Sequence, residues 1–135
     1  MPMNRLAKWM LGIGLTIWAV FFVTALVIYF YYDAPCGNET LSVSVSPNGD
    51  YQAVSFRRNC GATTSSSIQV SVLPAGIELG NEPGNVMVIR ESDMTPELLW
   101  RGPYDLEVLY PVNAQMSRVE VNAQEVAVEY TPVVE

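Results

Sequence analysis

The chain has 135 residues, half of them apolar, and its 14 acidic against 7 basic residues give a net charge of −7 at neutral pH. A charge of that sign opposes binding to nucleic acid or to anionic lipid. The sequence contains no histidine, and its single lysine, Lys8, precedes a long apolar run. Catalysis by a Ser-His, Cys-His or Ser-Lys pair is therefore excluded from the segment after that run, as are zinc sites built on histidine or several thiolates.

The first predicted element is a transmembrane helix over residues 10–32. This run, MLGIGLTIWAVFFVTALVIYFYY, carries no charge over 23 positions. At about 1.5 Å per residue such a helix is roughly 34 Å long, enough to cross a hydrocarbon layer of about 30 Å. Its polar members, Thr16 and Thr24, can bond back to their own helix. A cleaved signal peptide is disfavoured, because its apolar core is shorter and ends in small residues.

The distribution of charge predicts how this helix is oriented. Arg5 and Lys8 lie before the helix, whereas Asp33 follows it. Because positive charge stays on the cytoplasmic side, we expect residues 1–9 in the cytoplasm and residues 33–135 outside it, in the periplasm beyond a bacterial inner membrane. The outer segment holds five arginines and all 14 acidic residues, a net charge of −9 that keeps it soluble.

The outer segment, residues 33–135, is predicted to be one small all-β domain, an antiparallel sheet or sandwich. Apolar and polar residues alternate there with a period of two, and no helical pattern of useful length appears. Seven short strands at close spacing favour this fold class. They are expected over residues 41–46, 52–56, 68–72, 86–89, 106–110, 119–121 and 126–130. The longest candidate loop covers residues 74–85.

The register of the first hairpin follows from its turn. Asn48-Gly49 is the strongest two-residue signal for a hairpin turn. With these two residues as the turn, Val43 lies opposite Val54 and Leu41 lies opposite Phe56. All four then share one apolar face, which supports the register.

The same register brings the only two cysteines together. Extended along the ladder, it sets Cys36 opposite Gly61, so that Cys36 and Cys60 arrive within one residue of each other. Disulfides persist outside the cytoplasm, and closing a loop of about 25 residues stabilises by roughly 3–4 kcal/mol on chain entropy. We expect a disulfide. Two alternatives stay open: unpaired structural thiols, and a reactive Cys60 beside the two arginines that precede it.

One candidate partner-binding segment follows Cys60. The tract ATTSSS, residues 62–67, includes Thr63 and Thr64 and is small, uncharged and prone to turns. It either links two strands as solvated chain or offers its hydroxyl groups as a polar docking surface.

The second candidate partner-binding segment is the loop over residues 74–85. Loops on a rigid sheet commonly carry recognition, and this one is longer than the strands need. Glu78 and Glu82 would attract a basic partner. Ile77 and Leu79 either anchor that partner or fold back over the edge of the core.

With nucleophilic pairs and zinc sites excluded, only carboxylates could support catalysis or metal binding in the outer segment. An acid/base pair or a calcium site would have to draw on Glu78, Glu82, Glu91, Asp93, Asp105 and Glu107. Their spacing matches no known loop. We therefore expect a non-enzymatic domain with no cofactor, no bound metal and no small-molecule substrate.

Two motifs carry a resemblance to known proteins. SPNGDYQAV, residues 46–54, resembles the SPDGxYxA hairpin of Tol-type β-propeller blades, and LLW with YDLEV, residues 98–108, resembles a later piece of such a blade. A single copy cannot close a propeller, which needs several blades. The longer pattern from SPNGDYQAVSFRRNCGATTSSSIQVSVL through GNV is similar to a family of small bacterial envelope proteins with a Cys-Gly-Ala-Thr-Thr motif. The resemblance implies a secreted or membrane-anchored β protein and supplies no activity.

Together these features predict a single-pass membrane protein whose outer β domain binds another protein. One class is an accessory subunit of a membrane or envelope complex. Small residues in the helix, such as Gly12, Gly14, Thr16 and Ala19, either permit close packing against a second helix or are ordinary membrane residues. The alternative is an acidic inhibitor or immunity-type protein that neutralises a basic partner outside the cell membrane.

Overall fold

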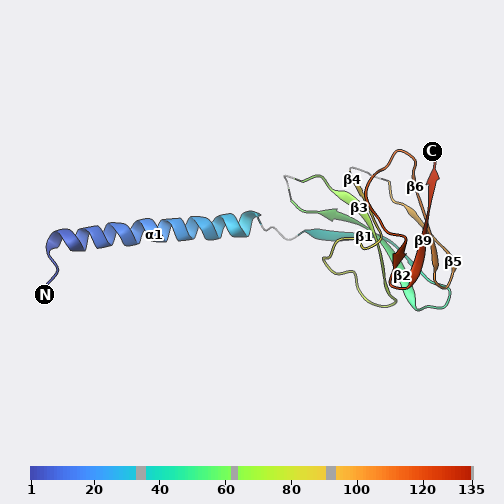
Figure 1. Cartoon of the computed structure of the whole chain (residues 1–135), viewed down its shortest axis with the longest axis horizontal. Coiled ribbons are helices and arrows are strands. Elements are labelled where there is room, and N and C mark those ends of the chain that lie inside the picture. The colour runs from blue at the N-terminus through green and yellow to red at the C-terminus, as the bar shows by residue number, and fades with distance from the viewer. Residues whose placement is uncertain (33–35, 62–63, 91–93, 135) are drawn as a thin grey trace. The chain divides into compact units, whose positions relative to one another are not determined.

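The computed structural model describes residues 1–32, 36–61, 64–90 and 94–134. The chain divides into two compact units, residues 1–34 and 35–135. Figure 1 shows a single long helix in the first unit and a layered β domain in the second.

Helix α1 (Arg5–Tyr32) is long and apolar enough to cross a membrane. It begins five residues before the predicted apolar run, because Asn4 caps it: the side-chain oxygen of Asn4 accepts a hydrogen bond from the main-chain N–H of Ala7 at 3.0 Å. The hydroxyls of Thr16 and Thr24 donate to main-chain oxygens four residues earlier, at 2.5 and 2.7 Å. As predicted, these two polar side chains are satisfied within their own helix.

The β domain is a sandwich of two sheets, described here over nine strands (Figure 1). The five-stranded sheet has the order β1 (Gly37–Val45), β2 (Tyr51–Asn59), β3 (Ser67–Pro74), β4 (Met87–Arg90) and β7 (Gln115–Val119). The four-stranded sheet has the order β5 (Glu97–Gly102), β6 (Asp105–Pro111), β9 (Val126–Val133) and β8 (Asn122–Ala123). Neighbouring strands are antiparallel except β6 and β9, which are parallel. The prediction of an all-β, largely antiparallel domain is confirmed.

The inner faces of the two sheets meet in one apolar core. Its buried members come from both sheets: Ala53, Val70, Val72, Val86, Met87, Ile89, Leu98, Leu106, Val108, Ala123, Val126 and Val128. The alternation along β3 and β9 places Val70, Val72, Val126 and Val128 on this inner face, as period-two patterning requires.

The predicted strand list was incomplete at the C-terminal side. It had no strand for β5, which pairs with β6 across a turn at Pro103-Tyr104. It also joined Val119 and Val121 in one strand, whereas β7 ends at Val119 in one sheet, Val121 lies outside both strands, and β8 belongs to the other sheet. The turn before β9 lies at Gln124-Glu125, where φ is 55° and 73°. Two positive φ values in succession are those of a tight hairpin turn, here between β8 and β9.

The turn between β1 and β2 has four residues and not the predicted two. The N–H of Ser46 donates to the carbonyl of Tyr51 at 2.8 Å, and the N–H of Gly49 donates to the carbonyl of Ser46 at 2.9 Å. Gly49 has a positive φ of 76°, whereas Asn48 does not, and a two-residue turn of the predicted kind needs both. Because residues 47–50 span the gap symmetrically, the longer turn leaves the pairing register unchanged.

A bulge then alters that register halfway along the hairpin. Val43 lies opposite Val54, as predicted. At Leu41 the ladder skips one residue, so that Phe56 lies opposite Thr40 and not opposite Leu41. Leu41 is the one extra residue that a β-bulge inserts into one of two paired strands.

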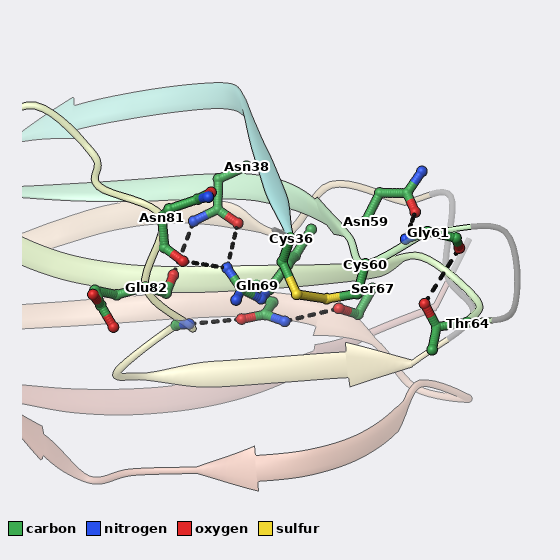
Figure 2. Close-up of a disulfide and its surroundings, with 12 residues drawn as sticks. Cys36, Asn38, Asn59, Cys60, Gly61, Thr64, Ser67, Gln69, Asn81 and Glu82 are labelled. Carbon is green, nitrogen blue, oxygen red and sulfur yellow. Dashed lines mark hydrogen bonds between the residues drawn. A yellow bond between two sulfur atoms is a disulfide. The ribbon is translucent and has the colours of Figure 1, made fainter. Parts of the chain in front are cut away.

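The bulge places the two cysteines directly opposite each other. Beyond the bulge, Gly37 pairs with Asn59, so Cys36 lies opposite Cys60. The prediction had placed it opposite Gly61. Their Cα atoms are 4.0 Å apart and their sulfur atoms are bonded (Figure 2). The predicted disulfide is confirmed, and the predicted one-residue offset is corrected.

Candidate interaction groove

The connection between β3 and β4, residues 75–86, folds back over the outer face of the five-stranded sheet. We call it the covering loop. Near its start, the side-chain amide of Gln52 donates to the carbonyl of Ile77 at 2.5 Å. The loop explains why Val54 and Phe56 are buried although they alternate with Ala53, which faces the core. The middle of β2, residues 53–56, is therefore buried on both faces.

Polar side chains next to the disulfide hold the middle of the covering loop. The side-chain amide of Asn38 donates to the carbonyls of Gly80 and Glu82, both at 2.9 Å. The guanidinium of Arg58 donates to the side-chain oxygen of Asn38 at 2.8 Å and to the carbonyl of Asn81 at 2.7 Å. Figure 2 shows part of this network beside the bonded cysteines. Arg58 thus serves to anchor the loop, which explains one of the two arginines that precede Cys60.

Asn85 fixes the end of the covering loop. Its side chain makes the pair of main-chain hydrogen bonds that a neighbouring strand would make. The side chain of Asn85 accepts a hydrogen bond from the N–H of Val72 at 2.8 Å and donates to the carbonyl of the same residue at 2.9 Å. Its main-chain N–H donates to the hydroxyl of Ser71 at 3.2 Å. Every residue of the loop therefore lies within two positions of a residue that is hydrogen-bonded to the sheet.

A groove of about 440 Å³ lies between the covering loop and the first two strands. Its lining residues are Thr40, Val43, Gln52, Val54, Gly76, Ile77, Glu78 and Leu79. Val43 on the strand side is 53 % exposed, and Ile77 on the loop side is 55 % exposed. We call this hollow the interaction groove. Its lining also includes the buried Val54 of β2.

The interaction groove brings together three of the residues predicted to bind a partner. Ile77, Glu78 and Leu79 line it, with Leu79 half-buried and the other two exposed. The exposure of Ile77 leaves its side chain accessible to a partner, and the role of both apolar residues stays a prediction. Glu82 is exposed on the same loop but does not line the groove; its carbonyl is bonded to Asn38.

The predicted hydroxyl-rich segment lies elsewhere. Thr63 falls outside the described residues. Thr64 is exposed and lines a different hollow, of about 470 Å³, with three serines of its tract and with Arg90 of β4. The two predicted segments therefore do not build one site.

The contribution of β1 to the groove was not predicted. The alternation Leu41, Val43, Val45 indicates a strand with one apolar face, and the structure leaves Val43 and Val45 of that face 53 % and 55 % exposed. One feature of the sequence could have indicated this contribution. Residues 41–46 carry no charge, which is unusual for a strand at the edge of a sheet.

Groups with shifted pKa values lie outside the groove, and their shifts arise from packing. A hydrogen bond from the Thr131 hydroxyl, and then one from Arg101, lower the pKa of the Glu107 carboxyl. Burial raises the pKa of Tyr130 to about 12; its hydroxyl lies 2.6 Å from the carbonyl of Glu120. Partial burial, followed by the Glu125 carboxylate, raises the pKa of Tyr51.

Within the described residues, no three Asp, Glu, His or Cys side chains lie close enough together to hold a metal ion. Two carboxylates of the predicted set, Glu91 and Asp93, fall outside those residues.

Comparison of the chain with protein-family models, with curated proteins and with solved structures finds no match. The resemblance to small bacterial envelope proteins stays a prediction. The function is inferred from the groove, the apolar helix and the disulfide.

Proposed function

We propose that α1 anchors this protein in a bacterial inner membrane and that the β domain binds another protein in the periplasm through the interaction groove. Helix α1 has the length and composition of a membrane span. The Cys36–Cys60 disulfide fits an oxidising compartment outside the cytoplasm. The positive residues before the helix favour a cytoplasmic N-terminus.

The groove itself is the observation that carries the proposal. Val43 and Ile77 expose apolar side chains on its two rims, and exposed apolar surface around a hollow is typical of protein-binding sites. The scaffold beneath is held by the disulfide and by the side-chain bonds of Asn38 and Arg58. A firmly held groove loses little conformational entropy when a partner docks.

Charge favours a basic partner. Glu78 is exposed at the groove, and the segment from residue 33 onward has a net charge of −9 with no lysine. A partner that presents arginine or lysine would be steered toward this surface. The same acidity favours a second candidate function, an inhibitor or immunity-type protein that neutralises a basic enzyme or toxin. An ordinary binding partner is active while this protein is bound to it. An inhibited enzyme or toxin is active only when this protein is not bound.

Site-specific photo-crosslinking in intact cells tests the proposal. A photo-reactive phenylalanine replaces Ile77 in the full-length protein, and a matched variant carries it at Val112, which is 60 % exposed in the turn after β6. We expect a crosslinked partner from position 77 and none from position 112. Glu78→Arg should weaken the capture, because complementary charge is lost.

Two outcomes would contradict the proposal. If capture at position 77 and co-purification both survive Glu78→Arg, but are lost when α1 is replaced by an unrelated membrane helix, recognition lies in the bilayer. If the mature protein begins near Cys36, α1 is a cleaved signal sequence and the domain is not anchored.

A further inference from the structure

The geometry of β1 points to how the partner is held. We propose that the partner adds a β-strand to the free edge of β1, and that this strand is an extended segment of another protein in which apolar residues alternate with residues that include arginine or lysine. The inference rests on the proposed function and specifies its binding mode and partner chemistry.

The main-chain groups of Val43 and Val45 point away from β2. In an antiparallel ladder, hydrogen-bonded pairs alternate with pairs that make no bond to each other. The N–H of Ser46 donates to the carbonyl of Tyr51, so that pair is bonded. The register is unbroken from there to Ser42, so Ser44 belongs to the next bonded pair. The N–H and C=O groups of Val43 and Val45 therefore face the outer edge.

That edge is open in the part of the chain that the structure describes. β1 pairs only with β2 there, and no hydrogen bond reaches the outward groups of Val43 and Val45. One side chain of the other sheet reaches β1: the indole N–H of Trp100 on β5 donates to the carbonyl of Ser44 at 3.0 Å. That carbonyl belongs to the bonded pair, so the outward row stays free. Such a row is a template for one more strand.

The usual protection of an edge strand is confined to the first half of β1. Glu39 and the bulge at Leu41 lie there, and charges and bulges both discourage strand addition. The second half, residues 42–45, reads Ser-Val-Ser-Val, with neither charge nor proline. Both of its valines are more than half exposed. A strand that adds to β1 would therefore pair with this half.

An added strand would place its side chains in the interaction groove. Val43 lies opposite Val54 and Val45 lies opposite Gln52, so both valines are on the groove face of the sheet. Alternate side chains of the added strand would lie on that face beside the valines and within reach of Ile77. Main-chain bonds to an edge with side-chain contacts in a neighbouring pocket are the two components of recognition by strand addition.

The charge around the groove selects a basic segment and disfavours a second copy of this chain. Glu78 is exposed in the lining. The nearby guanidinium groups are engaged, that of Arg57 with Glu39 at 3.4 Å and that of Arg58 with the loop. Pairing β1 with β1 of a second copy would bring together two domains of net charge −9, which repel each other.

Binding of a synthetic peptide to the full-length protein in neutral detergent micelles tests the inference. The probe is a capped, fluorescently labelled ten-residue peptide in which valine alternates with lysine and threonine, and binding is followed by anisotropy. In Val43→Pro the outward N–H is lost, yet the β1–β2 ladder does not use that N–H. The matched variant Val43→Thr keeps the N–H and a branched side chain. We expect Val43→Pro to weaken binding at least tenfold and Val43→Thr to retain most of it.

A change in the peptide makes the result independent of how well the proline variant folds. N-methylation of alternate peptide nitrogens removes the donors that would face β1, and methylation of the other set leaves them. Only the first peptide should lose binding to the unaltered protein. Replacing the lysines by glutamate should also abolish binding, and added salt should weaken the lysine peptide because it screens exposed charges.

The outcomes separate this inference from the proposed function. If a partner crosslinks at position 77 in cells but binding ignores Val43→Pro and both methylation patterns, the groove binds a partner and strand addition is wrong. If sedimentation shows dimers that Val43→Pro dissociates, the occupant is a second copy and the inference is overturned. If the lysine peptide does not bind and no partner crosslinks at position 77, both fail.

Discussion

Gly84 lies at a point of close approach between the covering loop and the sheet. A Cβ atom there would lie 2.8 Å from the main-chain oxygen of Val70 and 3.0 Å from the Cβ of Gln69. The N–H of Gly84 also donates to the side-chain oxygen of Gln69 at 2.6 Å. Because main-chain atoms of a central strand cannot move aside, only glycine fits.

Gly84→Ala should lower the free energy of unfolding by about 1–3 kcal/mol, the usual range for inserting a methyl group into a filled space. Gly80→Ala is the matched control, since nothing lies within 4 Å of a Cβ at that position in the same loop. Urea titration followed by circular dichroism compares the two variants. Equal stability of both would show that the loop does not rest on β3 as described.

At the scale of single residues, the sequence predicts chemistry better than exposure. The pairing of Cys36 with Cys60 follows from a register and two residue types. The exposure of Val43 does not follow, because it depends on which strand ends the sheet. That order is set by contacts between distant segments, and the alternation of valine with serine is the same in an edge strand as in a central one.

At the scale of elements, the disulfide and the bulge together define the β1–β2 hairpin. The bond joins residues 24 positions apart in the sequence. Replacing both cysteines by serine should cost a few kcal/mol at most, with roughly 3–4 kcal/mol expected from the chain entropy of a loop of this size. The ladder from Ser42 to Val45 does not include the cysteines, so peptide binding at that edge should be largely retained.

Chemical denaturation with and without reductant measures this cost. Alkylation of the denatured, unreduced protein should label neither cysteine. Rapid labelling of Cys60 with Cys36 also free would instead reopen the interpretation of Cys60 as a reactive thiol.

Which elements could be predicted depends on how much of their pattern is local. Strands β1, β2, β3, β6 and β9 were predicted because apolar and polar residues alternate along each of them, and β4 was predicted because it is a short apolar run. β8 has two residues and β7 is exposed along its whole length, so neither shows a burial pattern. The parallel pairing of β6 with β9 joins segments separated by β7 and β8. No turn motif in the sequence predicts this pairing, because parallel strands are not joined by a hairpin turn.

At the scale of the whole molecule, topology is the property with the largest consequence for function. Alkaline phosphatase is active only outside the cytoplasm, so a fusion after residue 135 should be active if α1 leaves the N-terminus inside. Phosphatase activity in whole cells, normalised to the amount of fusion protein on an immunoblot, measures this. A well-expressed but inactive fusion would reverse the orientation. Changing Arg5 and Lys8 to glutamate is the matched variant and should lower the active fraction.

The position of the disulfide also determines how the domain bears mechanical load. A pull transmitted along the chain from α1 reaches Cys36 before it reaches Gly37–Asn59, the first pair of the β1–β2 ladder. The disulfide passes that tension directly to Cys60, which follows the last residue of β2. β1 therefore cannot be unzipped from β2 one hydrogen bond at a time by force on the tether, and the hairpin that borders the groove keeps its shape while the molecule is under tension.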